Sequence, residues 1–303
     1  MPETLKVALI QQRCSGSRPE NLDRTLSGLE EAVRRGADLA LLPELHALPY
    51  PCQTEDPALF DLAEPLDGPT GRFLAQAAKR FGIVLVGSLF ERRAPGLYHN
   101  TAVVFERDGT LAGIYRKMHI PDDPGYYEKF YFAPGDLGFE PIPTSVGRLG
   151  VLVCWDQWFP EAARMMTLKG ADLLLYPTAI GFDPREDEEE QRRQLEAWQT
   201  VQRGHAIANG IFLLCCNRVG FEPDRSGQTA GIRFWGSSFI AGPQGEFLAR
   251  AADQETVLSA ELDGRRMEEV RRIWPFLRDR RIDAYGDLLR RFSDPLPLFG
   301  PSR

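Results

Sequence analysis

An internal duplication constrains the fold of this chain more than any other feature of its sequence. Three segments of the first half recur, in the same order, in the second half. Chance recurrence of one common helix-exit tetrapeptide, Gly-Ala-Asp-Leu, would account for one pair but not for three in register. The aligned pairs are residues 35–43 (RGADLALLP) with 169–177 (KGADLLLYP), 81–86 (FGIVLV) with 209–214 (NGIFLL), and a predicted β-hairpin at 101–115 with one at 238–249.

The repeated unit predicts the architecture. Each half has the order helix, strand, helix, strand and hairpin, which would form a mixed sheet with helices on one face. The other face of each sheet has to be buried, and two sheets stacked face to face bury both at once. We therefore expect an α/β fold, a four-layer αββα sandwich of two pseudo-repeated halves. It would form one domain over residues 1–290, followed by a C-terminal tail over residues 291–303.

Composition and charge narrow the classes of function. With 43% hydrophobic and 26% charged residues, the 303-residue chain has the composition of a globular protein with a large core. A formal net charge of −7 gives no electrostatic support for a nucleic-acid partner, and no apolar run approaches the ~20 residues of a membrane span. The N-terminus also lacks the apolar core of a secretory signal. We expect a cytoplasmic protein without nucleic-acid or membrane partners.

The cysteines favour a reducing compartment and argue against a metal site. The chain has five cysteines at irregular spacings, and a protein of this size does not need disulfide bonds for stability. The sequence contains no Cys-x-x-Cys pair, and its four histidines are scattered, so a zinc site is not expected. The five cysteines are therefore predicted to be free thiols.

Cys154 has the sequence setting of a nucleophile. It follows the apolar run at residues 151–153 and precedes a helix predicted to begin at Pro160, so it lies at a sharp strand-to-helix turn. Turn amides and a nearby helix N-terminus favour a thiolate and an oxyanion, and the amide of Trp155 would contribute to the latter. A buried structural cysteine is the alternative interpretation.

Two further candidates follow predicted strands. Glu44 comes after the strand at residues 37–42, and Lys117 comes after the hairpin at residues 101–115. In a sandwich of this kind, functional groups gather where strands end in loops. A cysteine nucleophile needs a base, such as Glu44, and a group that holds the charge of a tetrahedral intermediate, such as Lys117. Alternatively, Glu44 is a solvated turn acid and Lys117 is a surface cation.

Three motifs together resemble a known family. They are LLPEL at residues 41–45, YRKMH at residues 115–119 and VCWDQWFPE at residues 153–161. They resemble the three signatures of the nitrilase superfamily of carbon–nitrogen hydrolases, and the resemblance runs from residue 5 to residue 290. It implies an αββα fold, a homodimer or a larger stack of dimers, and no cofactor or metal.

The resemblance also implies roles for individual residues. It assigns a catalytic triad to Glu44 as base, Lys117 as oxyanion holder and Cys154 as nucleophile. Many members carry a second glutamate that orients the lysine, and Glu128 stands at the matching position. The implied activity is hydrolysis of a carbon–nitrogen bond, other than a peptide bond, in a linear amide.

One branch of the superfamily is the most similar. Residues 117–132 and residues 176–181 resemble the branch that hydrolyses N-carbamoylputrescine. This resemblance implies a small cationic ureido substrate, which is cleaved to putrescine, ammonia and carbon dioxide in polyamine biosynthesis.

Candidates for substrate binding follow from the position of the motifs. Asp122 and Asp123 lie in the loop after the expected catalytic lysine, and a carboxylate there would pair with the ammonium group of the substrate. Trp155, beside the expected nucleophile, and Thr178, in the segment at residues 176–181, are the other two candidates.

Three alternatives stay open on the sequence alone. The substrate could be another carbamoyl compound or amide, such as carbamoyl-β-alanine, a carbamoyl-amino acid or an ω-amide. The cysteine could instead work with a histidine, His119 or His205, as in papain-like hydrolases. A protein of a different class would be a non-catalytic nitrilase-like scaffold, although all three triad positions are intact in this chain.

Overall fold

The first half of the chain forms a mixed sheet of five strands with two helices on its outer side. The computed structural model describes residues 1–224 and 226–293. The elements of this half are β1 (Thr4–Gln11), α1 (Arg18–Arg34), β2 (Leu39–Leu41), α2 (Pro69–Phe81), β3 (Val84–Ala94), β4 (Leu97–Phe105) and β5 (Leu111–Arg116). Strands β1, β2 and β3 are parallel, whereas β3, β4 and β5 form antiparallel pairs.

The second half repeats the first element by element. Its elements are β7 (Gly147–Val151), α4 (Pro160–Leu168), β8 (Leu173–Thr178), α5 (Glu188–Asn209), β10 (Phe212–Asn217), β13 (Phe239–Ala241) and β14 (Phe247–Arg250). Strands β7, β8 and β10 are parallel, and β10, β13 and β14 are antiparallel neighbours. The predicted duplication is therefore confirmed in the topology, with α1 and α2 corresponding to α4 and α5.

One further strand completes each sheet at the same edge. Strand β15 (Thr256–Asp263) pairs antiparallel with β1, and β6 (Ile142–Thr144) pairs antiparallel with the corresponding strand β7. The strand orders are β15-β1-β2-β3-β4-β5 and β14-β13-β10-β8-β7-β6. Because β15 comes from the end of the second half, its pairing with β1 ties the two halves together.

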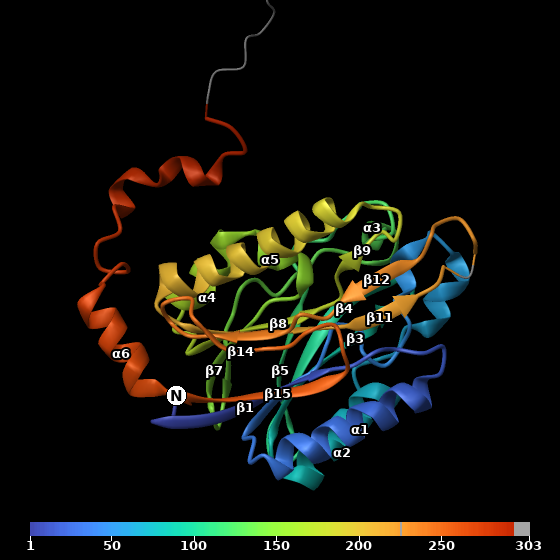
Figure 1. Ribbon diagram of the computed structural model, residues 1–303, viewed down its shortest axis with the longest axis horizontal. Coiled ribbons are helices and arrows are strands. Elements are labelled where there is room, and N and C mark those ends of the chain that lie inside the picture. Colours follow the sequence, from blue (N-terminus) through green and yellow to red (C-terminus); the bar gives the residue numbers. More distant parts are fainter. Residues whose placement is uncertain (225, 294–303) are drawn as a thin grey trace, which may run out of the picture.

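The two sheets pack face to face between two layers of helices (Figure 1). Leu41 and Val86 of the first sheet lie in the same buried cluster as Val151 and Leu175 of the second. On the outer face of the first sheet, Leu74 of α2 lies in a separate buried cluster with residues of β2 and β3. Each fully buried aliphatic side chain contributes about 1.5–3 kcal/mol to folding. The expected four-layer αββα sandwich is thus confirmed.

Short elements surround one rim of the sandwich. The loop after β5 contains α3 (Glu128–Tyr131). Strands β9 (Gly181–Phe182), β11 (Val219–Glu222) and β12 (Ile232–Trp235) form a small antiparallel sheet beside it. These elements were not predicted, because each depends on contacts with segments far away in the sequence.

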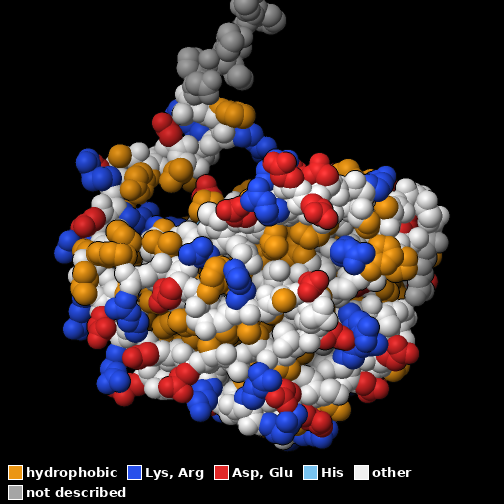
Figure 2. All heavy atoms as spheres, in the orientation of Figure 1, with side chains coloured by type: hydrophobic (Ala, Val, Ile, Leu, Met, Phe, Trp, Pro, Cys, Tyr) orange, Lys and Arg blue, Asp and Glu red, His pale blue; other side chains and the backbone are white. Residues whose placement is uncertain are grey.

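The C-terminal segment leaves the body of the molecule. After β15, helix α6 (Gly264–Ile273) packs against the sandwich through Met267 and Val270. Residues 274–293 then run away from the sandwich (Figure 1) and expose apolar side chains (Figure 2). Residues 294–303 of the predicted C-terminal tail lie outside the described residues. In the described part of the chain, no helix is long and apolar enough to cross a membrane.

Candidate active site

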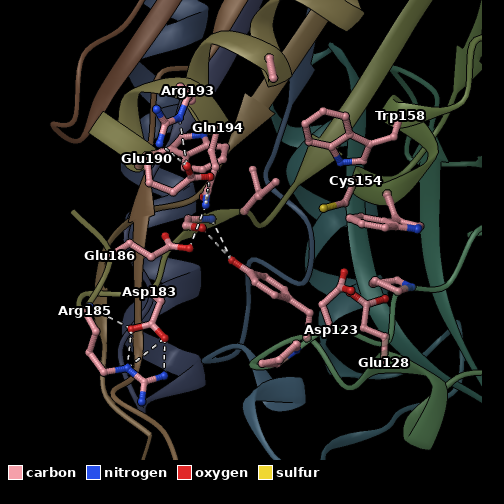
Figure 3. A pocket seen from close by; sticks show the side chains of 18 residues that line it. Asp123, Glu128, Cys154, Trp158, Asp183, Arg185, Glu186, Glu190, Arg193 and Gln194 are labelled. Atoms are coloured by element: carbon pink, nitrogen blue, oxygen red, sulfur yellow. Dashed lines mark hydrogen bonds and ion pairs between the residues drawn. The ribbon is translucent and has the colours of Figure 1, made fainter. Parts of the chain in front are cut away.

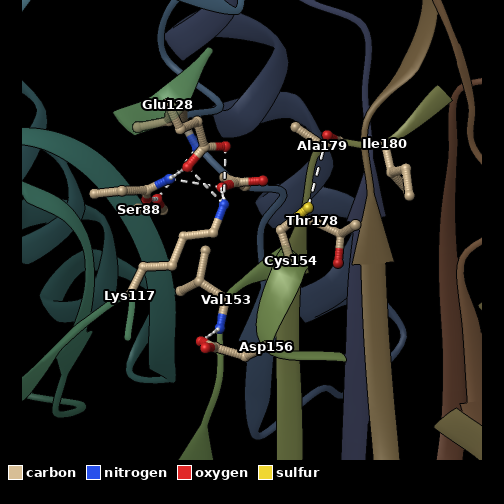
Figure 4. A network of polar contacts seen from close by, with 12 residues as sticks. Ser88, Lys117, Glu128, Val153, Cys154, Asp156, Thr178, Ala179 and Ile180 are labelled. Atoms are coloured by element: carbon tan, nitrogen blue, oxygen red, sulfur yellow. Dashed lines mark hydrogen bonds and ion pairs between the residues drawn. The ribbon is translucent and has the colours of Figure 1, made fainter. Parts of the chain in front are cut away.

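The ends of β2 and β5 bring a lysine between two glutamates. Lys117 follows β5, and its Nζ lies 2.9 Å from Oε1 of Glu44, which follows β2. The same nitrogen lies 2.8 and 2.7 Å from Oε1 and Oε2 of Glu128, the first residue of α3. All three side chains are buried, and Figure 4 shows Lys117 reaching toward Glu128. The lysine is therefore a positive charge held in one position.

Neutral side chains also donate hydrogen bonds to the two glutamates. Asn100 on β4 donates from Nδ2 to Oε1 of Glu44 at 2.6 Å, and the hydroxyl of Tyr50 donates to Oε1 of Glu128 at 2.7 Å. Ser88 on β3 donates to Oδ1 of Asn100. Oε2 of Glu44 is buried and has no hydrogen-bond partner among the described residues. This oxygen is free to accept a proton.

Cys154 lies at a strained turn directly after β7. Its φ of 43° is in the left-handed region, which costs a residue with a β-carbon about 1–2 kcal/mol. Residues 154–158 form a single 3₁₀ turn before α4 begins at Pro160. The side chain is 5% exposed, and its Sγ lies 3.7 Å from the carbonyl oxygen of Ala179 (Figure 4). The predicted strand-to-helix turn is present, with the thiol at the rim of the sandwich.

Asp156 fixes this turn to the loop that carries the lysine. Its buried carboxylate accepts hydrogen bonds from the amide of Val153 and the hydroxyl of Tyr115, each at 2.8 Å. It also accepts one from the amide of His119 at 3.0 Å. Since Tyr115 and His119 flank Lys117 in the chain, one carboxylate holds the cysteine turn and the lysine in register.

Arg218 supports the backbone next to Glu44. Its fully buried guanidinium donates to the carbonyl oxygens of Glu44 and Leu45 at 3.0 and 2.8 Å, and to that of Leu48 at 3.0 Å. Glu222 balances its charge at 2.6 Å. A charged donor to several carbonyls makes the turn after β2 rigid, and this fixes where the Glu44 side chain begins.

Burial and neighbouring charges set the protonation of the site. Burial raises the pKa of the Cys154 thiol well above its ordinary value, and Glu44 raises it further, whereas Lys117 lowers it. Burial alone would lower the pKa of Lys117, but Glu128 and Glu44 raise it well above its ordinary value. Burial also raises the pKa of Glu128, against the lowering effect of Lys117. At neutral pH the cysteine is thus a thiol and the lysine is charged.

A cavity of about 770 Å³ opens in front of Cys154 (Figure 3). Of the predicted substrate-binding residues, Trp155 and Asp123 line it, as does Glu128. Glu44 and Lys117 are fully buried beside Glu128 and are not part of the cavity lining. The apolar lining includes Pro121, Pro124, Tyr126, Trp158, Ile180, Ala197 and Trp235, and the charged lining also includes Asp183, Arg185, Glu186, Glu190 and Arg193.

Two predicted substrate-binding residues lie elsewhere. Asp122 is exposed and does not line the cavity. Thr178 is fully buried at the end of β8, where its Oγ1 accepts a hydrogen bond from Gln157 and donates one to the carbonyl oxygen of Tyr176. Because these bonds satisfy its hydroxyl inside the protein, Thr178 has no side-chain group available to a ligand in the cavity.

The two histidines of the papain-like alternative have other partners. Nδ1 of His119 lies 2.7 Å from Oδ1 of Asp156, and its ring stacks on Phe159 with centroids 3.8 Å apart. Nδ1 of His205 lies 2.9 Å from the hydroxyl of Tyr176. Within the described residues, the Cys154 thiol donates only to the carbonyl of Ala179. The geometry therefore favours Glu44 over a histidine as the base.

Sequence reasoning missed several residues of the site. Tyr50 lies in a proline-rich loop and Asn100 lies inside a strand, so neither has a local signal. Arg218 could have been found, because it directly follows β10 and the same strand-end rule had pointed to Glu44 and Lys117.

The arrangement suits nucleophilic attack on a carbonyl carbon. It combines a thiol at the cavity, a carboxylate oxygen without a partner, and a fixed ammonium that can hold a developing oxyanion. No group of three histidine, cysteine, aspartate or glutamate side chains in residues 1–224 and 226–293 could hold a metal ion.

The chain is similar to known proteins over nearly its whole length. A family model described as carbon-nitrogen hydrolase matches residues 6–272. The N-carbamoylputrescine amidase of Oryza sativa subsp. japonica is 43% identical, over 94% of this chain and 94% of that protein. The citrullinase of Francisella tularensis subsp. tularensis is 39% identical, over 95% of this chain and 99% of that protein. A crystal structure of a carbon-nitrogen hydrolase from Helicobacter pylori G27 matches with a TM-score of 0.94 and 57% identity, over 96% of this chain and 100% of that chain.

Proposed function

Because the chain belongs to the carbon–nitrogen hydrolase family, we propose that it hydrolyses N-carbamoylputrescine to putrescine, ammonia and carbon dioxide, a step of polyamine biosynthesis. The cavity carries this proposal: it is apolar along its sides, has Cys154 at one end, and is lined by acidic side chains opposite. A ureido group, an alkyl chain and an ammonium group would match these three parts in order. The relative from Oryza sativa is named for this substrate.

In the proposed first half-reaction, Oε2 of Glu44 accepts the thiol proton of Cys154 as the sulfur attacks the ureido carbon. The carbonyl oxygen becomes negatively charged, and Lys117 and the amide of Trp155 would stabilise it. Glu44 passes the proton to the terminal nitrogen, the carbon–nitrogen bond breaks, and ammonia leaves. An alkylcarbamoyl group remains on the sulfur.

In the second half-reaction, water replaces ammonia and Glu44 accepts its proton. The resulting hydroxide attacks the carbamoyl carbon, and the thiolate leaves and takes the proton back from Glu44. The released carbamate loses carbon dioxide and gives putrescine. Glu128 exchanges no proton in this scheme, and its part is to keep Lys117 oriented and charged.

The raised pKa of Cys154 supports a base that acts during the attack. A thiol that stays protonated at neutral pH is a weak nucleophile until its proton is removed. Glu44 supports the same assignment: within residues 1–224 and 226–293 its Oε2 has no hydrogen-bond partner, whereas its Oε1 already accepts from Lys117 and Asn100.

An ammonia-release assay tests the proposal. The wild-type protein should prefer N-carbamoylputrescine to carbamoyl-β-alanine, carbamoyl-D-amino acids and simple amides, and Cys154→Ala should lose turnover while keeping its fold. Preference for an anionic substrate would contradict the proposed substrate but not the proposed catalytic triad. Near-normal activity of Cys154→Ala would overturn the mechanism, and no turnover of any amide by the wild type would favour the scaffold alternative.

Citrulline is a second candidate substrate. It differs from N-carbamoylputrescine by a carboxylate on the carbon that carries the ammonium group. Two arginines, Arg185 and Arg193, line the cavity, and the citrullinase of Francisella tularensis is among the relatives. Adding citrulline to the same assay decides between the two.

The proposed place of action is the cytoplasm. All five cysteines are free and buried, which fits a protein that folds without disulfide bonds in a reducing compartment. A comparison of the polyamine content of cell extracts with and without the gene would test the proposed pathway.

A further inference from the structure

Five charged side chains line the wall of the cavity opposite Cys154 (Figure 3). They belong to residues 183–193, the segment that leads into α5 and forms its first turns. In Figure 3 the carboxylate of Glu186 points across the cavity toward the side that carries Cys154. The five are Asp183, Arg185, Glu186, Glu190 and Arg193.

Both arginines of this wall already have carboxylate partners. Nε of Arg185 lies 2.9 and 3.1 Å from the two carboxylate oxygens of Asp183, and its Nη2 contacts the same group. Arg193 donates to Glu190 at 2.8 and 3.0 Å and to Glu189 at 2.7 Å. The positive charges of the wall are therefore neutralised from within the same segment.

Among the five charged residues of this wall, Glu186 is the carboxylate that forms no ion pair with Arg185 or Arg193. Its Oε1 accepts a hydrogen bond from the neutral amide of Gln194 at 2.8 Å. Its Oε2 is buried, and among the described residues it has no hydrogen-bond partner. A buried acceptor without a partner destabilises the folded protein, and more so when it is charged. A cation bound in the cavity would supply the missing donor.

We infer that Glu186 binds the distal ammonium group of the substrate, and that the Asp183–Arg185 pair discriminates against a carboxylate on the same carbon. This inference rests on the proposed function, because it takes the ureido group to be held at Cys154. An ammonium donates three hydrogen bonds, so it can satisfy Oε2 of Glu186 and neutralise the charge of that carboxylate.

The same wall is unfavourable for a zwitterion such as citrulline. Its carboxylate would lie beside the carboxylate of Glu186. Asp183 already engages Nε and Nη2 of Arg185 and balances its charge, so only the remaining donors of Arg185 could reach a second carboxylate. A contact with a guanidinium whose charge is already balanced gains little, while the repulsion between like charges remains. Asp183 is thus the residue that keeps Arg185 from binding an α-carboxylate.

Substrate pairs make the inference testable. In N-pentylurea a methyl group replaces the ammonium of N-carbamoylputrescine, so the ratio of kcat/KM for the two compounds isolates recognition of the charge. We expect this ratio to fall at least tenfold in Glu186→Gln. It should stay within twofold of wild type in Glu188→Gln, which removes the same charge from an exposed residue of α5 outside the cavity.

A second variant tests the discrimination. Asp183→Asn should free Arg185 and raise kcat/KM for citrulline, relative to N-pentylurea, about fivefold or more. An unchanged N-carbamoylputrescine ratio in Glu186→Gln, or an unchanged citrulline ratio in Asp183→Asn, would overturn the corresponding part of the inference. The proposed function fails separately, if the wild-type protein releases no ammonia from N-carbamoylputrescine.

Discussion

At the scale of single residues, Asn100 determines which oxygen of Glu44 is available for chemistry. Its amide nitrogen lies 2.6 Å from Oε1 of Glu44 and 3.5 Å from Oε2 of Glu128, so it ties the two carboxylates together. With Lys117 on the same Oε1, only Oε2 of Glu44 stays open. Asn100 is therefore a positioning residue that touches no reacting atom.

The first prediction concerns this amide. Asn100→Leu should lower kcat at least tenfold with little change in KM, because Glu44 loses its fixed orientation while the cavity wall is unchanged. The lost hydrogen bonds should also lower the free energy of unfolding by about 1–3 kcal/mol. Steady-state kinetics and urea unfolding measure the two effects. Ser88→Ala is the comparison variant. It removes the hydrogen bond to Oδ1 of Asn100 and the one that Oγ accepts from the amide of Leu45, but it leaves the Asn100 amide on Glu44, so it should keep most of the activity.

The second prediction concerns His46, which is fully buried behind Glu44. Burial, reinforced by the charge of Arg218, lowers the pKa of His46 to about 3. The unfolded chain binds a proton at this residue below its ordinary pKa near 6.5 and the folded chain does not, so stability is lost as the pH falls through that range. At pH 5 this effect lowers the free energy of unfolding by about 2 kcal/mol.

Urea unfolding at pH 7 and pH 5 checks this effect. In His46→Asn, the difference in unfolding free energy between the two pH values should be smaller than in wild type by about 2 kcal/mol. Equal differences in the two proteins would contradict the prediction. The sign is unambiguous, because only a folded-state pKa below the unfolded one makes acid destabilising.

Only those residues of the candidate site that belong to a local sequence pattern could be predicted from the sequence. Glu44, Lys117 and Cys154 each follow a strand, and the structure brings the first two into contact. Tyr50 and Glu128 are hydrogen-bonded across 78 positions of the chain, which no local pattern reveals. The prediction for Thr178 failed to anticipate that Gln157, in the turn after Cys154, would occupy its hydroxyl.

At the scale of elements, the turn after β7 stores backbone strain at the candidate nucleophile. Cys154 has a positive φ, whereas Cys216, inside strand β10, is not among the residues with positive φ. Both side chains are buried. The two positions therefore allow a comparison between a strained and a relaxed cysteine in one protein.

The third prediction follows from this contrast. Glycine adopts a positive φ without a steric penalty. Cys154→Gly should therefore have a free energy of unfolding about 1 kcal/mol higher than that of Cys154→Ala. At Cys216 the order should be reversed, with alanine more stable than glycine by about 0.5–1 kcal/mol. Chemical unfolding of the four variants measures both differences. If alanine is more stable than glycine at both positions, the turn at Cys154 is not strained.

At the scale of the whole molecule, the described part of the C-terminal segment beyond Ile273, residues 274–293, leaves many large apolar side chains exposed. Large apolar side chains on α6 and beyond it are exposed, and Leu289 is 95% exposed. Exposed apolar residues that gather on one segment mark an interaction surface. The other exposed apolar side chains on α6 and in this segment include Ile273, Trp274, Phe276, Ile282, Leu288 and Phe292.

The fourth prediction is that a second copy of the chain covers this segment. We propose that the protein is a homodimer or a larger homo-oligomer, and that deletion of residues 274–303 converts it to a monomer. Sedimentation velocity of the two proteins at the same concentration measures the change. A full-length monomer, or a truncated protein that stays oligomeric, would contradict the proposal.

The architecture was more predictable than the rim. Three aligned segments were enough to predict two stacked sheets, because repeated strands and helices must bury equivalent faces. The pairing of β15 with β1, and the small sheet of β9, β11 and β12, could not be predicted, since these strands are short or distant and their partners depend on the assembled fold. The cavity wall that includes Glu186 belongs to a segment rich in charged residues, and no local pattern in that segment indicates a cavity.

The duplication has a consequence for the symmetry of the site. Glu44 and Thr178 each follow the last proline of the repeated segment, and the amide of Glu44 donates to the carbonyl of Thr178 at 3.3 Å. The pseudo-twofold axis relating the halves therefore passes near this bond. In a symmetric dimer of half-length chains, a glutamate at this position would meet its own copy, and two buried like charges repel. Joining the halves in one polypeptide lets selection keep the acid on one side of the axis and a neutral residue on the other.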